Sequence, residues 1–108
     1  MSSRTVVAIG LGLALCAGLP LQAADGDAEA GKQKKQMCEG CHGIAGYRTA
    51  YPVVYSAPKL GGQTVGYLVK SLQDYRDGAR KHPSMNGVAA SLSEQDMADL
   101  AAYYTGAN

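Results

Sequence analysis

The sequence contains no phenylalanine and no tryptophan, so its seven tyrosines are the only large aromatic side chains available to a hydrophobic core. It has ten Lys and Arg against nine Asp and Glu. This near balance argues against a nucleic-acid partner, which would require a clear basic excess. No stretch alternates apolar and polar residues, and no internal repeat is present, which argues against a sheet and against a repeat protein. We therefore expect one small all-α domain.

A positive charge and a short apolar run open the chain. Arg4 precedes an apolar stretch that ends at Leu19, and Pro20 and several small residues follow. This order is typical of a secretory signal peptide, and the run is too short for a comfortable membrane span. We expect residues 1–23 to be removed during export, which leaves residues 24–108 as the mature domain. Cleavage one residue later and an uncleaved membrane anchor stay open as alternatives.

The five residues from Cys38 to His42 have the C-x-x-C-H pattern of covalent haem attachment. Two thiols at this spacing reach the vinyl groups of one porphyrin edge, and the imidazole that follows can bind the iron from the proximal side. A redox disulfide should follow a strand, and a zinc site needs two more ligands, whereas the mature chain offers only His82. We interpret Cys38 and Cys41 as thioether anchors of haem c and His42 as its proximal ligand. The third cysteine, Cys16, lies in the signal peptide.

Three segments have the marks of helices. Residues 27–38 carry acidic residues early and lysines late, which suits the helix dipole. Residues 64–77 begin with a Thr cap, keep their apolar residues on one face and are followed by Gly78. A last helix begins at Ser93 with a capping-box sequence. The segments rich in Gly and Pro are predicted loops: 43–46, 58–62 and 82–87.

A distal iron ligand must come from another Met or His. Met37 adjoins Cys38 on the proximal side, and Met97 fits the apolar stripe of the last helix, where packing explains it. Met85 lies in a predicted polar loop, where no helical periodicity accounts for an apolar side chain. A haem face would bury it. We assign Met85 as the distal ligand and keep His82 as the alternative.

As an ordered set, these features resemble the small, soluble, single-domain cytochromes c of the bacterial periplasm. The resemblance covers residues 27–105 and implies an all-α cytochrome c fold, with three to five short helices wrapped around one covalently bound haem. The residues and segments that carry it are, in chain order, Gly31, Cys38 to His42, Ala57 to Gln63, Tyr67 with Leu68, Leu72, Tyr75, Gly78, Arg80, Met85, Leu92 to Asp96, and Tyr103 with Tyr104.

The resemblance also implies roles for residues outside the C-x-x-C-H motif. Gly31 would let the first helix cross closely over the last, against the paired tyrosines near the C-terminus. The Pro58 carbonyl would accept a hydrogen bond from the ring of His42, fixing the imidazole and raising its basicity. Leu60 would line the haem pocket.

Six ligands would leave the iron no open position, so we expect electron transfer rather than enzymatic chemistry. The expected function is a periplasmic carrier of single electrons between transient redox protein donors and acceptors, without stable membrane insertion. A permanent electron-transfer subunit of a larger dehydrogenase is one alternative. A haem enzyme or gas sensor with a dissociable Met85 is another. Five cations would form a basic docking rim, or else scattered solvated charge: Lys59, Lys70, Arg76, Arg80 and Lys81.

Overall fold

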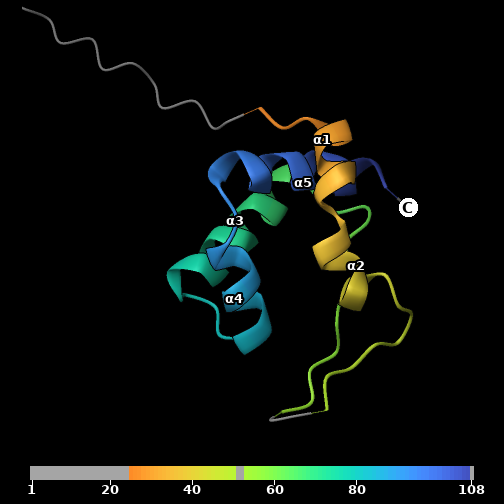
Figure 1. Cartoon of the computed structure of the whole chain (residues 1–108), viewed down its shortest axis with the longest axis vertical. Helices are drawn as coiled ribbons and strands as arrows, with labels where there is room; N and C mark the ends of the chain where they lie inside the picture. The colour runs from red at the N-terminus through yellow and green to blue at the C-terminus, as the bar shows by residue number, and fades with distance from the viewer. Residues whose placement is uncertain (1–24, 51–52, 108) are drawn as a thin grey trace, which may run out of the picture.

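The computed structural model describes residues 25–50 and 53–107, and the predicted signal peptide lies outside this part of the chain. The described residues form five helices and no strand, apart from one isolated bridge between Arg48 and Ser56. The all-α prediction is confirmed. None of the described helices combines the length and the apolar character that a membrane span requires. In chain order (Figure 1) the helices are α1 Ala28–Lys34, α2 Gln36–His42, α3 Val65–Asp77, α4 Pro83–Ala90 and α5 Glu94–Gly106.

The predicted first helix is two short helices that meet at Lys35. Asp27 caps α1, because its carboxylate accepts hydrogen bonds from the backbone N–H groups of Glu29 and Ala30, at 2.9 and 3.3 Å. The predicted end at Cys38 is wrong, since the helical backbone continues to His42. Between Cys38 and His42 no residue interrupts a helix strongly enough to end it. The C-x-x-C-H motif therefore lies on α2 rather than in a loop.

Helix α3 follows the prediction at both ends. The Thr64 hydroxyl accepts a hydrogen bond from the Tyr67 N–H at 3.2 Å. Gly78 ends the helix in the left-handed conformation, at φ 80°, which a residue with a Cβ rarely adopts. Leu68 is buried on the inner face. These local signals fix the length of α3, which packs against α4 and α5.

Helix α4 corrects the prediction of a loop over residues 82–87. The chain is helical from Pro83 to Ala90. Proline is favoured at the first helical position because its missing N–H would have no partner there. The His82 ring acts as the N-cap and accepts a hydrogen bond from the Met85 N–H at 3.2 Å. Met85 therefore lies in the first turn of a helix.

Helix α5 carries most of the hydrophobic core. Ser93 and Asp96 form the predicted capping box, each side chain accepting from the other residue's backbone N–H. Met97 is completely buried and packs with Leu92 and Leu100. This packing role of Met97 is the one expected from the sequence.

A buried carboxylate joins α1 to α5, which lie across one another in Figure 1. Asp99 is 3% exposed. It accepts hydrogen bonds from the Asp27 N–H at 2.8 Å, the Lys34 ammonium at 2.6 Å and the Gln95 amide at 2.9 Å. These donors stabilise the charged form, with the Asp27 N–H foremost, and lower the pKa of Asp99 to about 2.

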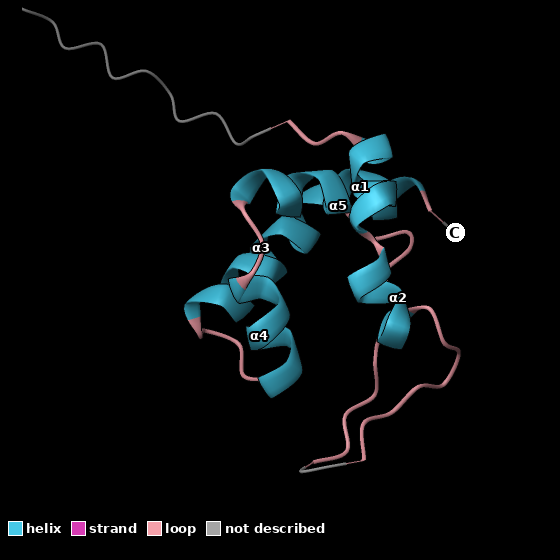
Figure 2. Cartoon of the chain, in the orientation of Figure 1, coloured by secondary structure: helices cyan, strands magenta, loops and turns pink. Residues whose placement is uncertain are grey.

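The connection from α2 to α3 is a long loop. Figure 2 shows it leaving the helical part of the molecule and returning to it. Toward its far end the loop is closed by the Thr49 hydroxyl, which donates to the Val53 carbonyl and accepts from the Tyr55 N–H, both at 2.9 Å. Its returning half carries Pro58 and Leu60 back toward α2.

Candidate functional site

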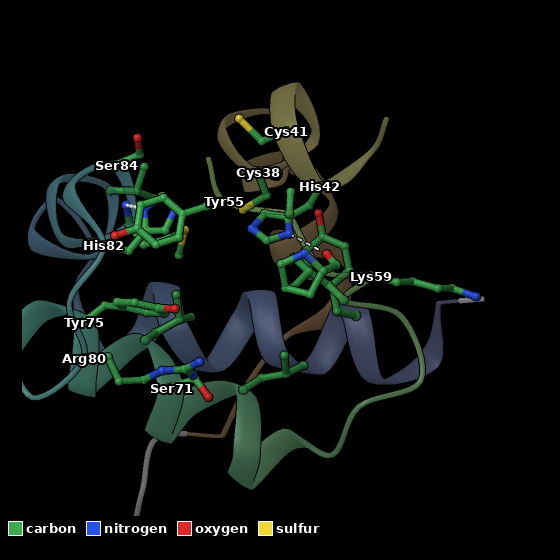
Figure 3. A pocket seen from close by; sticks show the side chains of 18 of the residues that line it. Cys38, Cys41, His42, Tyr55, Lys59, Ser71, Tyr75, Arg80, His82 and Ser84 are labelled. Carbon is green, nitrogen blue, oxygen red and sulfur yellow. Dashed lines mark hydrogen bonds between the residues drawn. The ribbon is translucent and has the colours of Figure 1, made fainter. Parts of the chain in front are cut away.

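One cavity of about 590 Å³ lies between α2, the returning loop, α3, α4 and α5 (Figure 3). Its volume is within the range of pockets that hold small molecules and cofactors, roughly 300–1,000 Å³. The long loop, three separate helices and the motif-bearing α2 all contribute walls. All six residues that the sequence analysis singled out as site residues line it: Cys38, Cys41, His42, Pro58, Leu60 and Met85.

Helix α2 presents the C-x-x-C-H residues to this cavity. Positions three and four apart share a helix face, so Cys38 lies on the same face as Cys41 and His42. Both cysteines are half-buried and free. Burial raises the pKa of the Cys38 thiol. A redox-active thiol needs a lowered pKa, so this environment does not favour the redox-disulfide alternative.

The zinc alternative finds no additional ligands. Among the described residues, no three His, Cys, Asp or Glu side chains come together as a metal-binding group. His82, the one further candidate in the mature sequence, lies on the cavity side that carries Ser84, whereas Cys38 and His42 lie on the other side in Figure 3. A four-ligand zinc site therefore has no support in the described chain.

The ring of His42 is held by the loop. Its Nδ1 atom lies 2.6 Å from the Pro58 carbonyl oxygen, to which it donates when that nitrogen carries the proton. This is the contact that the resemblance implied. A carbonyl at Nδ1 fixes the tautomer and leaves the lone pair of Nε2 available to a metal.

Three methionines and one histidine are candidates for the distal ligand, and they occupy different places in the structure. Met97 is buried in the core and does not line the cavity. Met37 lines the cavity, but from α2 itself, the element that carries His42, and its side chain is half-exposed. Met85 and His82 both line the cavity from the α4 side. The imidazole of His82 already caps α4 through Nδ1 and packs on Tyr55, with ring centroids 4.3 Å apart.

The cavity walls suit a large apolar disc with anionic groups at its edge. Leu68, Leu72, Val88 and Leu100 are among the apolar side chains that line it. The Tyr104 hydroxyl is buried and has no hydrogen-bond partner among the described residues. Burial also raises the pKa of Tyr104, so its hydroxyl stays neutral more readily. The residues present therefore fit a haem.

The cations near the cavity divide into two groups. Lys70 pairs with Asp74, and Arg76 pairs with both Asp77 and Glu94, so these two cations are engaged. Neither belongs to the cavity wall. Three other cations line the cavity and form no ion pair within the described part of the chain: Lys59, Arg80 and Lys81.

The residues that hold the turn around Met85 were not predicted from the sequence. Asn86 was assigned to a loop, although its side-chain amide donates to the carbonyls of Tyr75 and Arg80, at 2.7 and 2.8 Å. Arg80 also lies over the Tyr75 ring, at 4.6 Å from its centroid. The only local signal was the His-Pro pair at positions 82 and 83, since proline favours the first position of a helix.

Comparisons with known proteins agree with this geometry. The family profile described as Cytochrome c matches residues 28–105. Cytochrome c4 of Pseudomonas aeruginosa is 44% identical over 81 residues, which is 75% of this chain and 38% of that protein. Cytochrome c-554(548) of Halomonas halodenitrificans is 45% identical over 83 residues, which is 74% of this chain and 95% of that protein. The chain thus spans well under half of the first relative and nearly all of the second.

The fold has a counterpart among solved structures. The crystal structure of reduced recombinant cytochrome c4 from Pseudomonas stutzeri superimposes with a TM-score of 0.58 and 32% sequence identity. The match covers 79% of this chain and 53% of that chain. The helical arrangement around the cavity is therefore similar to part of a known haem protein.

Proposed function

The chain belongs to the cytochrome c family, whose members carry covalently bound haem c, and on this basis we propose that it is an electron carrier. When bound, the haem supplies a one-electron couple between ferric and ferrous iron. We assign Cys38 and Cys41 as its thioether anchors, His42 as the proximal ligand and Met85 as the distal ligand. The observation that carries this assignment is that all four side chains line one cavity, Met85 from α4 and the others from α2.

The proximal side is organised by the loop. The Pro58 carbonyl, 2.6 Å from Nδ1 of His42, orients the imidazole and can accept the Nδ1 proton, which would leave the lone pair of Nε2 for the iron. Because Pro58 and Leu60 stand on the same returning loop, that loop both positions the ligand and closes the cavity wall. A ring fixed in this way needs little rearrangement when the charge at the metal changes.

On the distal side, the proposed Met85 ligand would leave no iron position open to a substrate. Apolar side chains, Leu68 and Val88 among them, also line the cavity. A thioether ligand also favours the reduced state and raises the reduction potential. Both effects suit electron transfer, and we infer that the protein is not an enzyme.

Electron transfer would take place with soluble redox proteins in the periplasm. Residues 1–23 supply the export signal, and residues 24–108 form the exported domain. Lys59, Arg80 and Lys81 give the cavity rim three cations that are not engaged with carboxylates of the described chain. Such a rim suits transient docking of acidic partners, at rates that fall as salt rises.

Absorption spectra of the exported, haem-loaded protein test the assignment. A ferric haem with His and Met ligands has a weak near-infrared band that arises from the iron–sulfur bond. We expect this band in the wild type and in Met97→Ala, whose side chain lies in the core, but not in Met85→Ala. A wild type that lacks the band while staying low-spin would transfer the assignment to His82. A high-spin wild type would indicate an open, reactive iron.

A further inference from the structure

His82 and Asn86, which lie on either side of Met85 in the sequence, hold the first turn of α4 through hydrogen bonds. His82 accepts the Met85 N–H at its ring, at 3.2 Å, and its carbonyl accepts the Asn86 N–H at 2.8 Å. The His82 N–H donates in turn to the side-chain oxygen of Asn86 at 2.9 Å. His82 and Asn86 are therefore joined by two hydrogen bonds, with Met85 between them.

Asn86 also ties this turn to two other parts of the chain. Its side-chain NH₂ donates to the Tyr75 carbonyl at the end of α3, at 2.7 Å, and to the Arg80 carbonyl in the loop before α4, at 2.8 Å. One side chain thus uses both of its donor hydrogens and its acceptor oxygen within the protein. Few single side chains could replace it, because the three contacts require an oxygen and an NH₂ group on opposite sides of one carbon.

Two tyrosine rings also hold the imidazole of His82 in place. It packs against Tyr55 of the returning loop and, edge-on at 6.5 Å, against Tyr75 of α3. Figure 3 shows Tyr55 and His82 in contact at the side of the cavity that Ser84 also marks. The turn that carries Met85 is consequently anchored to α3, to the loop before α4 and to the returning loop.

We propose that Asn86 is a positioning residue for the distal ligand, holding the first turn of α4 so that the Met85 thioether stays at the iron. This inference rests on the proposed function of Met85. A thioether is a weak iron ligand, and its release is favoured when the turn that bears it can move away. The three side-chain bonds of Asn86 oppose that movement.

Binding of imidazole to the ferric holoprotein tests the proposal. Added imidazole can reach the iron only when Met85 is released, so its apparent dissociation constant varies inversely with the released population. We expect Asn86→Ala to bind imidazole roughly tenfold or more tightly than the wild type, because three hydrogen bonds of the closed state are lost. We also expect it to lose its near-infrared band at a lower pH. The matched control is Ser91→Ala, which removes a 2.7 Å hydrogen bond from the other end of α4.

The outcomes separate this inference from the ligand assignment. A wild type with the near-infrared band, tighter imidazole binding in Asn86→Ala and unchanged binding in Ser91→Ala support the proposal. Equal imidazole affinity in Asn86→Ala and the wild type, or an equal gain in Ser91→Ala, overturns it while Met85 remains the ligand. A wild type without the band overturns both. Should Asn86→Ala fail to yield folded holoprotein, Asn86→Ser, which is too short to reach both carbonyls, replaces it under the same criteria.

Discussion

Gly31 of α1 lies directly against the backbone carbonyl of Asp99 in α5, so that a Cβ atom at position 31 would lie 2.0 Å from that oxygen. It would also lie 2.9 Å from the Cβ atom of Tyr103. Neither backbone can move aside without separating the two helices. The Asp99 carboxylate also holds them together, because it binds the Asp27 N–H and the Lys34 ammonium at the two ends of α1. The crossing of α1 over α5 therefore depends on the absence of a side chain at Gly31.

We expect Gly31→Ala to lower the free energy of unfolding of the holoprotein by roughly 1–3 kcal/mol, the usual cost of overpacking. Chemical denaturation measures the change. The matched control is Gly66→Ala in α3, where an added Cβ meets no atom within 4 Å. Alanine there should stabilise the helix by roughly 0.5–1 kcal/mol. An unchanged stability in Gly31→Ala would mean that the crossing is looser than the structure has it.

The Asp99 carboxylate should make stability depend on acid pH. Its pKa is lowered to about 2 in the folded protein, below the ordinary value of about 3.9 in the unfolded chain. A group with a depressed pKa stabilises the fold above its unfolded pKa, and this contribution is lost as the pH falls from about 4 to about 2. The shift corresponds to roughly 2.5 kcal/mol.

Asp99→Asn tests this dependence. The variant should be less stable than the wild type near neutral pH, because Lys34 loses its buried partner, and the difference should shrink between about pH 4 and pH 2. Denaturation of the holoprotein at a series of pH values measures both effects. Asp25→Asn, at an exposed position, is the control and should follow the wild-type curve. A constant difference between Asp99→Asn and the wild type would refute the linkage.

The parts of the fold that could be predicted are those with signals in adjacent residues. Thr64 and Gly78 bound α3, and Ser93 with Asp96 begins α5, because each cap uses backbone groups only a few residues away. Helix α4 has only the weak signal of Pro83 at its first position. Histidine is not among the preferred N-cap residues, and the helix is held from outside by bonds to α3 that its own sequence does not reveal.

The site divides in the same way. Cys38 and His42 could be selected from a five-residue motif whose chemistry is local. Met85 was selected because an apolar side chain in a loop needs a place to be buried, yet it lies on a helix. The choice of residue stands as a proposal, while the reason given for it was wrong. The contribution of Asn86 could not be predicted, because its partners Tyr75 and Arg80 are brought to it only by the fold.

The cations of the cavity rim should govern reaction with anionic oxidants. Lys59 lines the cavity and has no ion-pair partner in the described chain, whereas Lys32 lies on α1, outside the cavity wall. Lys59→Glu and Lys32→Glu change the net charge equally. We expect Lys59→Glu to slow oxidation of the ferrous protein by hexacyanoferrate(III) roughly twofold to tenfold at low salt, and Lys32→Glu to have a smaller effect. Stopped-flow rates at several ionic strengths measure this. If both substitutions slowed oxidation equally, the effect would come from net charge alone, and Lys59 would have no special role at the cavity.

Covalent haem attachment should be required for a cooperative fold. Three of the seven buried hydrophobic residues of the described chain are alanines at positions 89, 98 and 101, and a cavity of about 590 Å³ adjoins the small cluster around Met97. A domain this small has too little core to be stable around an empty space. We expect the double variant Cys38→Ser, Cys41→Ser to show no cooperative thermal transition by circular dichroism.

Cys16→Ser is the matched control for that experiment. Cys16 belongs to the segment that we expect to be removed on export, so its substitution should leave haem content, mature mass and the unfolding transition unchanged. A cooperative transition at the wild-type temperature in the double serine variant would contradict the dependence on haem. Because that result would require the side chains around Leu68 and Leu100 to collapse onto one another, it would also mean that the cavity closes without the cofactor.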